Sequence, residues 1–451
     1  MLYHATQYLS QGESYSMRVP ASTDCTRNAY HYGTLVKNKL ASTDLMVVIK
    51  IGLIGKTNTG KTTFFNSATL GTGEISNYPF TTQQPSIGNA NAITLCVHKE
   101  LNVQDNPKNS RCLDGWRFIP IELVDLPGLI KGAWKGKGLG NQFLSIAAQS
   151  DALLHLVDVS GGIDASGKIA EPGTGDPIAD IADIEEELVM WYLKLLEGNR
   201  DKISRAINSG IEEVAAITDI FRGIGVREQH VKFALEVNKL LGVKFDDWEP
   251  AKAKDFSWSL RDISKPTLIV ANKVDLHYAS ENFKRLREEY KDTIIVPCSA
   301  DAELTLRRAE IRGMIKYLPG DERFEIKDQQ KLNDKQKWAL NFIRKDILGE
   351  YMRTGVQFAI NVTVFKLLRM NAVYPVADTG KLSDKHGNIL PDVYLMKSGS
   401  TIEDLAREIH TELVKGLLYA IDIRDGLRLP NNYHIKDRDI LSIVSAIKKK
   451  T

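Results

Sequence analysis

One run of eight residues has the types and spacing needed to hold phosphate groups, since it matches the pattern GxxxxGK(S/T) in full. Its glycines let the backbone turn so that successive N–H groups point at phosphate oxygens. Lys61 would neutralise the β- and γ-phosphates of a nucleotide, and the Thr62 hydroxyl would ligate magnesium. The run, with the residue that follows it, is Gly55-Lys56-Thr57-Asn58-Thr59-Gly60-Lys61-Thr62-Thr63.

The segments on either side are those that such a loop requires. Val47–Ile54 is a β-branched apolar run of strand length, which predicts a strand buried on both faces. Residues 63–68 predict the start of a helix, whose N-terminus adds the positive end of a dipole. A merely structural glycine turn is the alternative, but the strand–loop–helix order favours phosphate binding.

A second chemical pattern, DxxG, follows the apolar run Phe118–Val124 and includes Asp125 and Gly128. An aspartate at the end of a strand can hold magnesium through water, and the Gly128 N–H can reach a γ-phosphate. The pattern alone is weak evidence. Here, however, it ends a predicted buried strand downstream of a phosphate loop.

A third pattern indicates a guanine base. The predicted strand Pro266–Ala271 ends in Asn272-Lys273-Val274-Asp275. Asp275 would present two acceptors to the N1–H and N2–H₂ edge of guanine, whereas adenine offers only one donor and an unprotonated N1 there. The predicted strand Thr293–Pro297 runs into Cys298-Ser299-Ala300, and the Ser299 and Ala300 N–H groups are expected to reach the guanine O6.

Together these segments resemble a translation-factor-type GTPase, and three more stretches resemble the Obg-like family. Tyr78-Pro79-Phe80-Thr81-Thr82 resembles its first switch, in which the threonine (here Thr82) closes on magnesium. Residues 125–133 and 138–144 resemble its glycine-rich second switch. Residues 387–392 and 401–410 resemble a TGS domain, and the whole is similar to the YchF-related branch over residues 46–451.

This chain departs from the best-known YchF members at the base-recognition pattern. Those members have a Glu-ended motif and favour ATP, whereas this chain has Asp275. The resemblance therefore leaves an ATPase as an alternative, while the Asp275 carboxylate favours GTP.

The residues expected to act in hydrolysis are Lys61, Thr82, Gly128 and Asn58. Many GTPases place a glutamine directly after DxxG to orient water, but here the residue is Leu129. We therefore expect slow turnover, about 10⁻⁴ to 10⁻² per second. The resemblance suggests that Asn58 ligates potassium, and a turn-stabilising asparagine is the alternative.

The sequence predicts an α/β fold: a P-loop GTPase domain with a mostly parallel sheet, an inserted helical domain and a C-terminal β-grasp (TGS) domain. The insertion carries 13 basic and 20 acidic residues, and its apolar residues at helical spacing predict a helical hairpin or small bundle with its own core. The predicted units are a tail or misassigned start (1–45), a discontinuous GTPase domain (46–163 and 263–331), the acidic insertion (164–262), a helical connector (332–370) and the TGS-like domain (371–451).

Composition narrows the class of protein. The chain has 451 residues, 43% of them apolar, and a net charge of +2, so whole-chain charge favours no particular partner. Cys25, Cys96, Cys112 and Cys298 form no CxxC pair, which excludes a zinc ribbon and a disulfide scaffold and fits a reducing cytosol. No apolar stretch is long enough to span a membrane.

We therefore expect a cytoplasmic, monomeric GTPase switch that uses GTP/GDP, Mg²⁺ and, by the resemblance, K⁺. Its expected partner is the ribosome, ribosomal RNA or a ribosome-bound factor, with a protein partner on the helical insertion. A nucleotide-gated protein scaffold with incidental hydrolysis is the alternative from another class.

Overall fold

The computed structural model describes residues 48–70, 74–75, 85–129, 131–135 and 140–446. The predicted tail, residues 1–45, and Thr82 of the predicted first switch lie outside the described residues. Within the described ranges, no helix is both long enough and apolar enough to cross a membrane.

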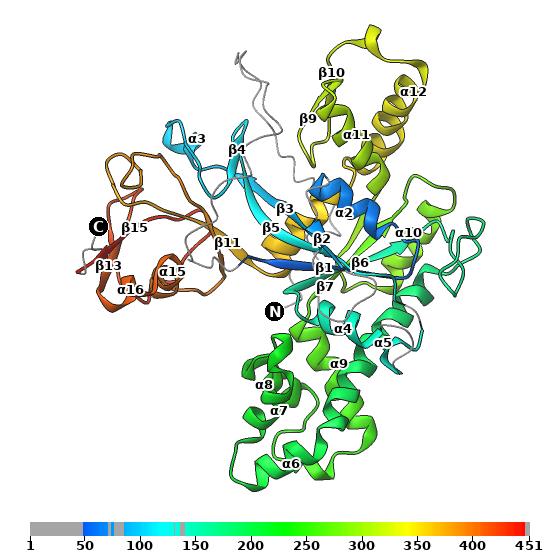
Figure 1. Ribbon diagram of the computed structural model, residues 1–451, viewed down its shortest axis with the longest axis vertical. Helices are drawn as coiled ribbons and strands as arrows, with labels where there is room; N and C mark the ends of the chain where they lie inside the picture. Colours follow the sequence, from blue (N-terminus) through cyan, green and yellow to red (C-terminus); the bar gives the residue numbers. More distant parts are fainter. Residues whose placement is uncertain (1–47, 71–73, 76–84, 130, 136–139, 447–451) are drawn as a thin grey trace.

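A mixed sheet forms the centre of the molecule, with strand order β2-β3-β5-β1-β6-β7-β8 and β4 beside β5 (Figure 1). Strands β5, β1, β6, β7 and β8 are parallel, whereas β3 runs antiparallel to β5. This arrangement confirms the mostly parallel sheet, and it brings the loops after the parallel strands to one edge. The strands are β1 (Lys50–Ile54), β2 (Glu74–Ile75), β3 (Ser86–Leu95), β4 (Arg111–Leu113), β5 (Trp116–Asp125), β6 (Ala152–Asp158), β7 (Thr267–Asn272) and β8 (Ile295–Cys298).

Helices cover both faces of this sheet, because successive side chains of a strand point to opposite faces. On one face, Ile51 and Leu53 of β1 pack with α2 (Lys61–Thr69) and α14 (Val356–Val362). On the other face, Ile54 belongs to an apolar cluster with α4 (Gly140–Ala148) and α5 (Pro177–Gly198). The remaining helices of this part are α3 (His98–Leu101), α4 (Gly140–Ala148), α10 (Ala279–Glu289) and α11 (Ala300–Ile311).

Between β6 and β7 the chain forms a helical region that extends away from the sheet (Figure 1). It begins at a capped helix, since the Asp176 side chain accepts a hydrogen bond from the Ile178 N–H and Pro177 occupies the first helical position. Its helices are α5 (Pro177–Gly198), α6 (Arg200–Asn208), α7 (Glu213–Phe221), α8 (Glu228–Val237) and α9 (Pro250–Ser264).

The apolar stripes of these helices pack against one another, and the core that they form is continuous with that of the sheet. Leu188, Trp191 and Phe256 belong to the same buried cluster as Ile54 and Leu129, which lie at or just beyond the carboxyl ends of β1 and β5. The helices are therefore an extension of the main core, because their apolar stripes continue the apolar face of the sheet.

Residues 332–370 are largely helical, as predicted, but they do more than join domains. α12 (Asp334–Phe342) packs with the hairpin of β9 (Ile315–Tyr317) and β10 (Phe324–Ile326), and α14 packs under the main sheet. A short helix, α13 (Gly349–Tyr351), lies between α12 and α14.

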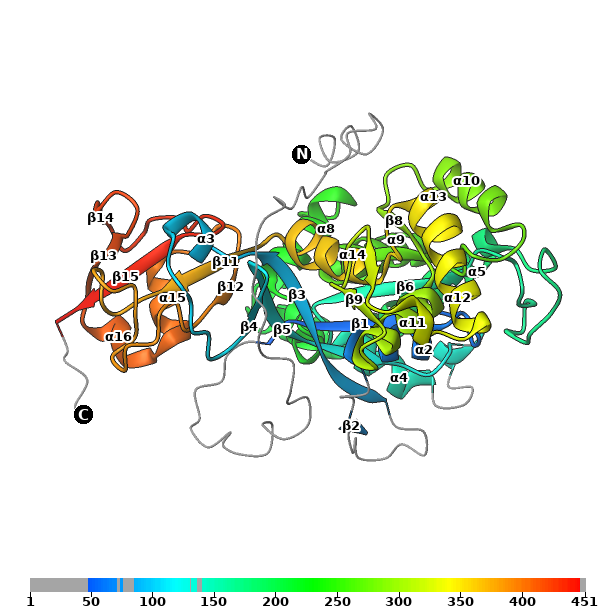
Figure 2. The ribbon, with the colours of Figure 1, turned by 90° about the horizontal axis from the view of Figure 1, so that it is seen from above.

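The C-terminal domain is a five-stranded sheet with strand order β12-β11-β15-β13-β14, in which β11 and β15 are parallel and the other pairs antiparallel. α15 (Ile402–Ile409) packs Ile402 and Leu405 against it, which confirms the β-grasp fold. Figure 2 shows this domain beside α3 at one end of the molecule. Its other elements are β11 (Met370–Pro375), β12 (Tyr394–Lys397), α16 (Thr411–Lys415), β13 (Leu417–Asp422), β14 (Arg428–Leu429) and β15 (Ile440–Ser445).

Candidate nucleotide-binding site

The predicted phosphate loop lies between β1 and α2, and its shape requires two of its glycines. Gly55 and Gly60 have φ angles of +142° and +94°. A Cβ atom on Gly55 would lie 2.3 Å from the Leu156 carbonyl oxygen, and one on Gly60 would lie 2.2 Å from Asn272 Nδ2. Only glycine fits both positions, because each combines an unusual φ with close contact to a neighbouring strand.

Lys61 lies at the centre of this loop. Its Nζ donates to the carbonyl oxygens of Gly55 at 3.1 Å and Lys56 at 2.6 Å, and its side chain is buried. Burial lowers the pKa of Lys61 to about 8, against the opposing influence of Asp125. The ammonium is thus held by weak neutral acceptors, which phosphate oxygens can replace.

Thr62 and Asp125 come from different elements and meet beside Lys61. The Thr62 hydroxyl donates to Asp125 Oδ2 at 2.8 Å. Asp125 Oδ1 is buried and has no hydrogen-bond partner among the described residues, and burial raises the pKa of this carboxyl. A hydroxyl and an unsatisfied carboxylate oxygen are donors that suit Mg²⁺, so these two residues fit the predicted metal position.

The segment after DxxG is attached to the phosphate loop. The Leu129 N–H donates to the Gly55 carbonyl at 3.1 Å, and a Cβ on Gly128 would lie 2.6 Å from the Thr57 nitrogen. The Leu129 side chain is buried in the cluster with Ile54 and Val124. It therefore points into the core, where it has no access to a water molecule on the nucleotide.

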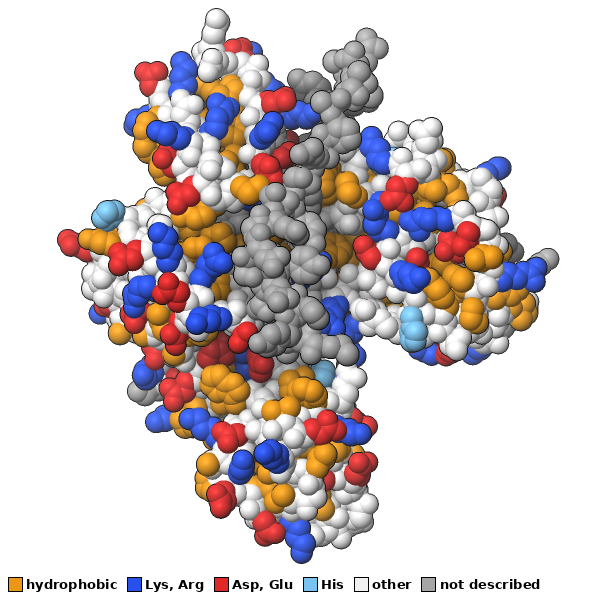
Figure 3. Space-filling model, turned by 180° about the vertical axis from the view of Figure 1, so that it is seen from behind, with side chains coloured by type: hydrophobic (Ala, Val, Ile, Leu, Met, Phe, Trp, Pro, Cys, Tyr) orange, Lys and Arg blue, Asp and Glu red, His pale blue; other side chains and the backbone are white. Residues whose placement is uncertain are grey.

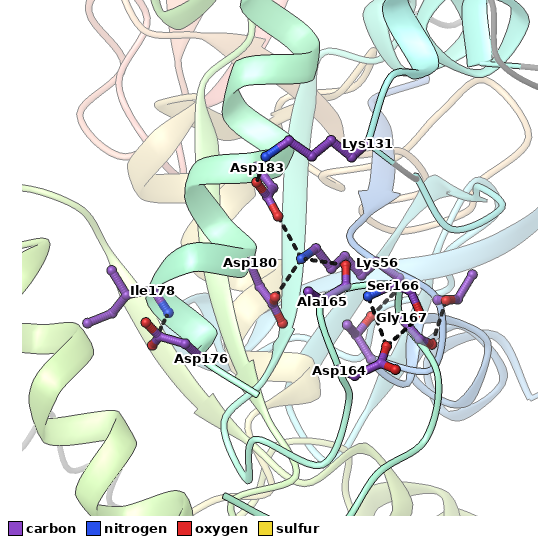
Figure 4. A network of polar contacts seen from close by, with 12 residues as sticks. Lys56, Lys131, Asp164, Ala165, Ser166, Gly167, Asp176, Ile178, Asp180 and Asp183 are labelled. Atoms are coloured by element: carbon purple, nitrogen blue, oxygen red, sulfur yellow. Dashed lines mark hydrogen bonds and ion pairs between the residues drawn. The ribbon is translucent and has the colours of Figure 1, made fainter. Parts of the chain in front are cut away.

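The side chain of Lys56 does not serve the phosphates in this structure. Its Nζ lies 2.7 Å from Asp180 Oδ1 and 2.8 Å from Asp183 Oδ2, both on α5 (Figure 4). Lys131, from the predicted second switch, also pairs with Asp183 at 3.2 Å. The expectation that Lys56 binds nucleotide is thus restricted to its backbone, because two carboxylates already neutralise the ammonium.

The loop after β6 covers the adjacent part of the phosphate loop. The Gly167 carbonyl accepts hydrogen bonds from Thr57 Oγ1 at 2.7 Å and Asn58 Nδ2 at 2.9 Å. Asn58 is exposed and has a φ of +62°. Because the amide nitrogen makes this bond, the amide oxygen of Asn58 remains available to a cation.

The predicted base-recognition residues are joined to the phosphate loop by Asn272. This buried side chain donates to the Thr59 carbonyl at 2.8 Å and accepts from the Ala300 N–H at 3.1 Å. Lys273 Nζ pairs with Asp158 Oδ2 at 2.6 Å. The ends of β1, β6, β7 and β8 are therefore linked through side chains at one edge of the sheet.

Among the remaining residues predicted to recognise the base, Asp275 has free acceptor atoms, whereas the N–H groups of Ser299 and Ala300 already have acceptors. Asp275 is half-buried, and within the described part of the chain its carboxylate makes no hydrogen bond or ion pair. The Ser299 N–H donates to the Thr354 carbonyl at 2.8 Å, and the Ala300 N–H is used by Asn272. Both N–H groups therefore already have an acceptor. Binding of the guanine O6 by these two groups stays a prediction, and it requires that O6 replace at least one of these acceptors or share an N–H with it.

Of the other predicted site residues, Thr59 donates its hydroxyl to the Lys56 carbonyl at 3.1 Å, and Thr63 is half-buried on α2. Three acidic residues that pair with lysines of the predicted site were missed from the sequence: Asp158, Asp180 and Asp183. The available signal for Asp158 was its place at the end of the apolar run 152–157, since such ends meet at the site. No short-range signal marks Asp180 and Asp183 as partners of the loop.

Comparisons with known proteins agree with this geometry. Family profiles match residues 50–188 ("50S ribosome-binding GTPase"), 270–378 ("Obg-like GTPase YGR210-like, G4 motif-containing domain") and 382–445 ("TGS domain"). An uncharacterized GTP-binding protein of Methanocaldococcus jannaschii is 44% identical over 398 residues, which are 88% of this chain and 99% of the relative.

Two further proteins bear on the fold and the nucleotide. The crystal structure of a GTP binding protein from Pyrococcus horikoshii has a TM-score of 0.71 at 35% identity, and the match covers 88% of this chain and all of that one. The Ribosome-binding ATPase YchF of Bacillus subtilis is 28% identical over 294 residues, 61% of this chain and 70% of the relative. The phosphate loop, the linked base-recognition edge and the full-length match to the archaeal relative place this chain in the Obg-like GTPase family, in its YchF-related branch with a C-terminal TGS domain.

Proposed function

We propose that this protein binds GTP with Mg²⁺ and hydrolyses it slowly to GDP and phosphate, as a molecular switch. The observation that carries this proposal is the Asn272 side chain, which joins the phosphate loop at Thr59 to the base-recognition edge at Ala300. One buried amide thus positions both ends of a nucleotide site, and the loop cannot shift without disturbing the base end.

Guanine is favoured by Asp275. Its carboxylate has no partner among the described residues, so both oxygens can accept from the N1–H and N2–H₂ groups of guanine. Adenine would leave one acceptor facing another, which costs about 1–3 kcal/mol for each unsatisfied buried group. Two relatives are named GTP-binding proteins, but four are named ATPases, so ATP is the competing ligand.

The phosphates would be held by the N–H groups of residues 55–63 and by Lys61. Thr62 and Asp125 would hold Mg²⁺, the aspartate through water, and Thr82 would complete the metal ligands when the first switch closes. Mg²⁺ supplies charge that stabilises the phosphates during transfer. The Gly128 N–H would contact the γ-phosphate, so GTP and GDP would set two different positions of the second switch.

Hydrolysis would be slow without assistance, because Leu129 is buried and cannot orient water. We propose that potassium assists, with the free amide oxygen of Asn58 as a ligand. Turnover in potassium chloride should exceed that in sodium chloride at equal ionic strength, and Asn58→Ala should remove the difference. Equal rates in the two salts would rule out the potassium role.

A competition experiment tests whether the protein prefers GTP or ATP. GTP and ATP should be titrated against one fluorescent guanine nucleotide on the full chain, with magnesium present. We expect GTP to displace the probe at a concentration at least about 100-fold lower than ATP, which corresponds to about 2.7 kcal/mol of discrimination. Equal or stronger competition by ATP would make the protein an ATPase.

We further propose that the switch acts in the cytoplasm on the ribosome or a ribosome-bound factor, since a ribosome-binding profile and a relative named ribosome-binding support it. On the face in Figure 3, acidic and basic side chains intermingle over the residues drawn in colour. Any contact with RNA on that face would therefore involve small groups of basic side chains, since acidic side chains lie between them. A protein partner on the insertion stays a prediction, for which the exposed Phe233 and Val237 of α8 offer a surface.

Co-sedimentation with ribosomal particles tests this role at several salt concentrations, with a GTP analogue or with GDP. The ribosomal switch requires association that depends on which nucleotide is bound. Nucleotide-independent capture of another protein, with no ribosomal association, would instead support a scaffold whose hydrolysis is incidental.

A further inference from the structure

Four side chains with metal-binding atoms meet at the far end of the main sheet, away from the phosphate loop. Cys96 follows β3, His98 is the first residue of α3, Asp105 lies in the next loop, and Cys112 is on β4. Their four donor atoms all lie within 4.8 Å of one another. Cys96, His98 and Asp105 are buried, and Cys112 is half-buried.

Three of the six separations between the donor atoms are those of a tetrahedral site. Metal–ligand bonds of about 2.0–2.3 Å give tetrahedron edges of about 3.3–3.8 Å between donor atoms. The Asp105 Oδ2 atom lies 3.3 Å from both Cys96 Sγ and His98 Nδ1. Cys112 Sγ lies 3.4 Å from His98 Nδ1. The group therefore needs little rearrangement to surround one ion.

The charge of the surroundings also fits a divalent ion. The fully buried guanidinium of Arg117 lies 3.8 Å from Asp105 Oδ2. Two thiolates, one carboxylate and a dication leave one negative charge, which this arginine would neutralise. Charge balance of this kind allows an ionic cluster to be buried.

We propose that Cys96, His98, Asp105 and Cys112 bind one structural Zn²⁺. Two sulfur donors and one imidazole exclude the hard cations Ca²⁺ and Mg²⁺, which take oxygen ligands. Zinc accepts sulfur, nitrogen and carboxylate oxygen with four ligands, and a site with four protein ligands has no open position for catalysis.

The ion would fix the segment between Asp105 and Cys112, which is hydrogen-bonded to the C-terminal domain. Between the ligands, the N–H groups of Asn106 and Lys108 donate to the carbonyls of Ile389 at 2.8 Å and Pro391 at 2.7 Å. Asn109 exchanges two hydrogen bonds with the Val393 backbone, at 2.9 and 3.0 Å. Residues 106–109 thus run along residues 389–393, and zinc would hold them in that position.

Metal analysis of the full chain tests the site directly. Protein produced with zinc in the medium and then desalted should hold about one zinc per chain. After removal of zinc, titration with Co²⁺ should give the intense thiolate-to-cobalt charge-transfer band and the visible bands of tetrahedral cobalt. Retention of less than about a tenth of an equivalent, together with no such bands, would overturn the proposal.

Variants separate the ligands from general effects of losing a cysteine. Cys96→Ser and Cys112→Ser should each lower the zinc content at least about tenfold, whereas Cys298→Ala, in the main core, should keep it. His98→Cys supplies another zinc ligand and should retain metal, while His98→Phe should not. If His98→Phe holds as much zinc as the wild type, His98 is not a ligand and the proposed four-ligand site is wrong.

Hydrogen exchange tests the consequence for domain docking. Chelation of zinc from the wild type should speed amide exchange in residues 106–109 and 389–393 at least about tenfold, with little change in β6 or β7. If exchange in these two segments is the same with and without zinc, the ion does not hold the domains together.

Discussion

The ammonium of Lys56 lies 2.7 Å from Oδ1 of Asp180, so the second residue of the phosphate loop is tied to helix α5. Both side chains are more than nine-tenths buried. A buried ion pair is costly to break on one side only, because the remaining charge loses its partner. This contact therefore couples the position of the phosphate loop to the helical insertion.

Replacing Asp180 should expose that coupling. We expect Asp180→Leu to lower the free energy of unfolding by about 3 kcal/mol, because Lys56 would keep only the partly exposed Asp183 as a charged partner. Urea denaturation without nucleotide measures the loss. The double variant Lys56→Met/Asp180→Leu should recover much of it, since no uncompensated charge remains. An additive double variant would contradict the coupling; Asp262→Asn, whose carboxylate is exposed, is the matched control.

Guanine selectivity should depend on Asp275. Asp275→Asn exchanges one acceptor for a donor, so affinity for GTP should fall about 100-fold, by about 3 kcal/mol. Xanthosine triphosphate presents an acceptor where guanine has its 2-amino group, and its affinity should rise. Calorimetric titration of both nucleotides measures the exchange. Asp292→Asn, an exposed aspartate outside the site, should leave both affinities unchanged. Unaltered GTP binding by Asp275→Asn would argue against base recognition by this residue.

Nucleotide affinity should fall at alkaline pH because of Lys61, whose pKa in the free protein is about 8. Phosphate oxygens favour the ammonium, so binding raises this pKa and takes up a proton when Lys61 starts neutral. The contribution is fully present below pH 8 and declines above it by up to about tenfold per pH unit. Calorimetry in buffers of different ionisation enthalpy measures the proton uptake. Lys61→Arg keeps the charge and should lose the pH dependence; the same dependence in that variant would assign it to another group.

The free energy of unfolding at acidic pH should depend on His155. This strand β6 residue is buried, and burial lowers its pKa to about 3, with Arg261 and two loop lysines adding to the effect. Between pH 3 and 6.5 the unfolded chain binds a proton that the folded chain does not. Stability therefore rises with pH across this window, by up to about 1.4 kcal/mol per pH unit, and levels off above it.

Urea denaturation at several pH values tests this slope. His155→Leu removes the titrating group, so the dependence between pH 3 and 6.5 should become flatter by about one proton. The exposed His277→Leu is the control and should keep the wild-type slope. An unchanged slope in His155→Leu would show that other groups cause the acid sensitivity.

The sequence by itself determined the family, the fold class and the local chemistry of the phosphate loop. These follow from short-range rules: Gly55 and Gly60 permit backbone angles that other residues disfavour, and Lys61 and Thr62 are placed by the turn between a strand and a helix. Strand β3 was harder to predict, because Gly88, Asn89 and Asn91 disfavour a strand and only its ten-residue pairing with β5 makes it one.

Only the tertiary structure decided which distant side chains meet. Lys56 finds its carboxylates 124 and 127 positions along the chain, so the motif alone gave no indication of where its ammonium lies. Cys96 and Cys112 form no spacing pattern, and they come together with His98 and Asp105 because β3, β4 and β5 pair in one sheet. Local patterns encode backbone shape over a few residues, whereas contacts between charged or metal-binding groups depend on how whole elements pack against one another.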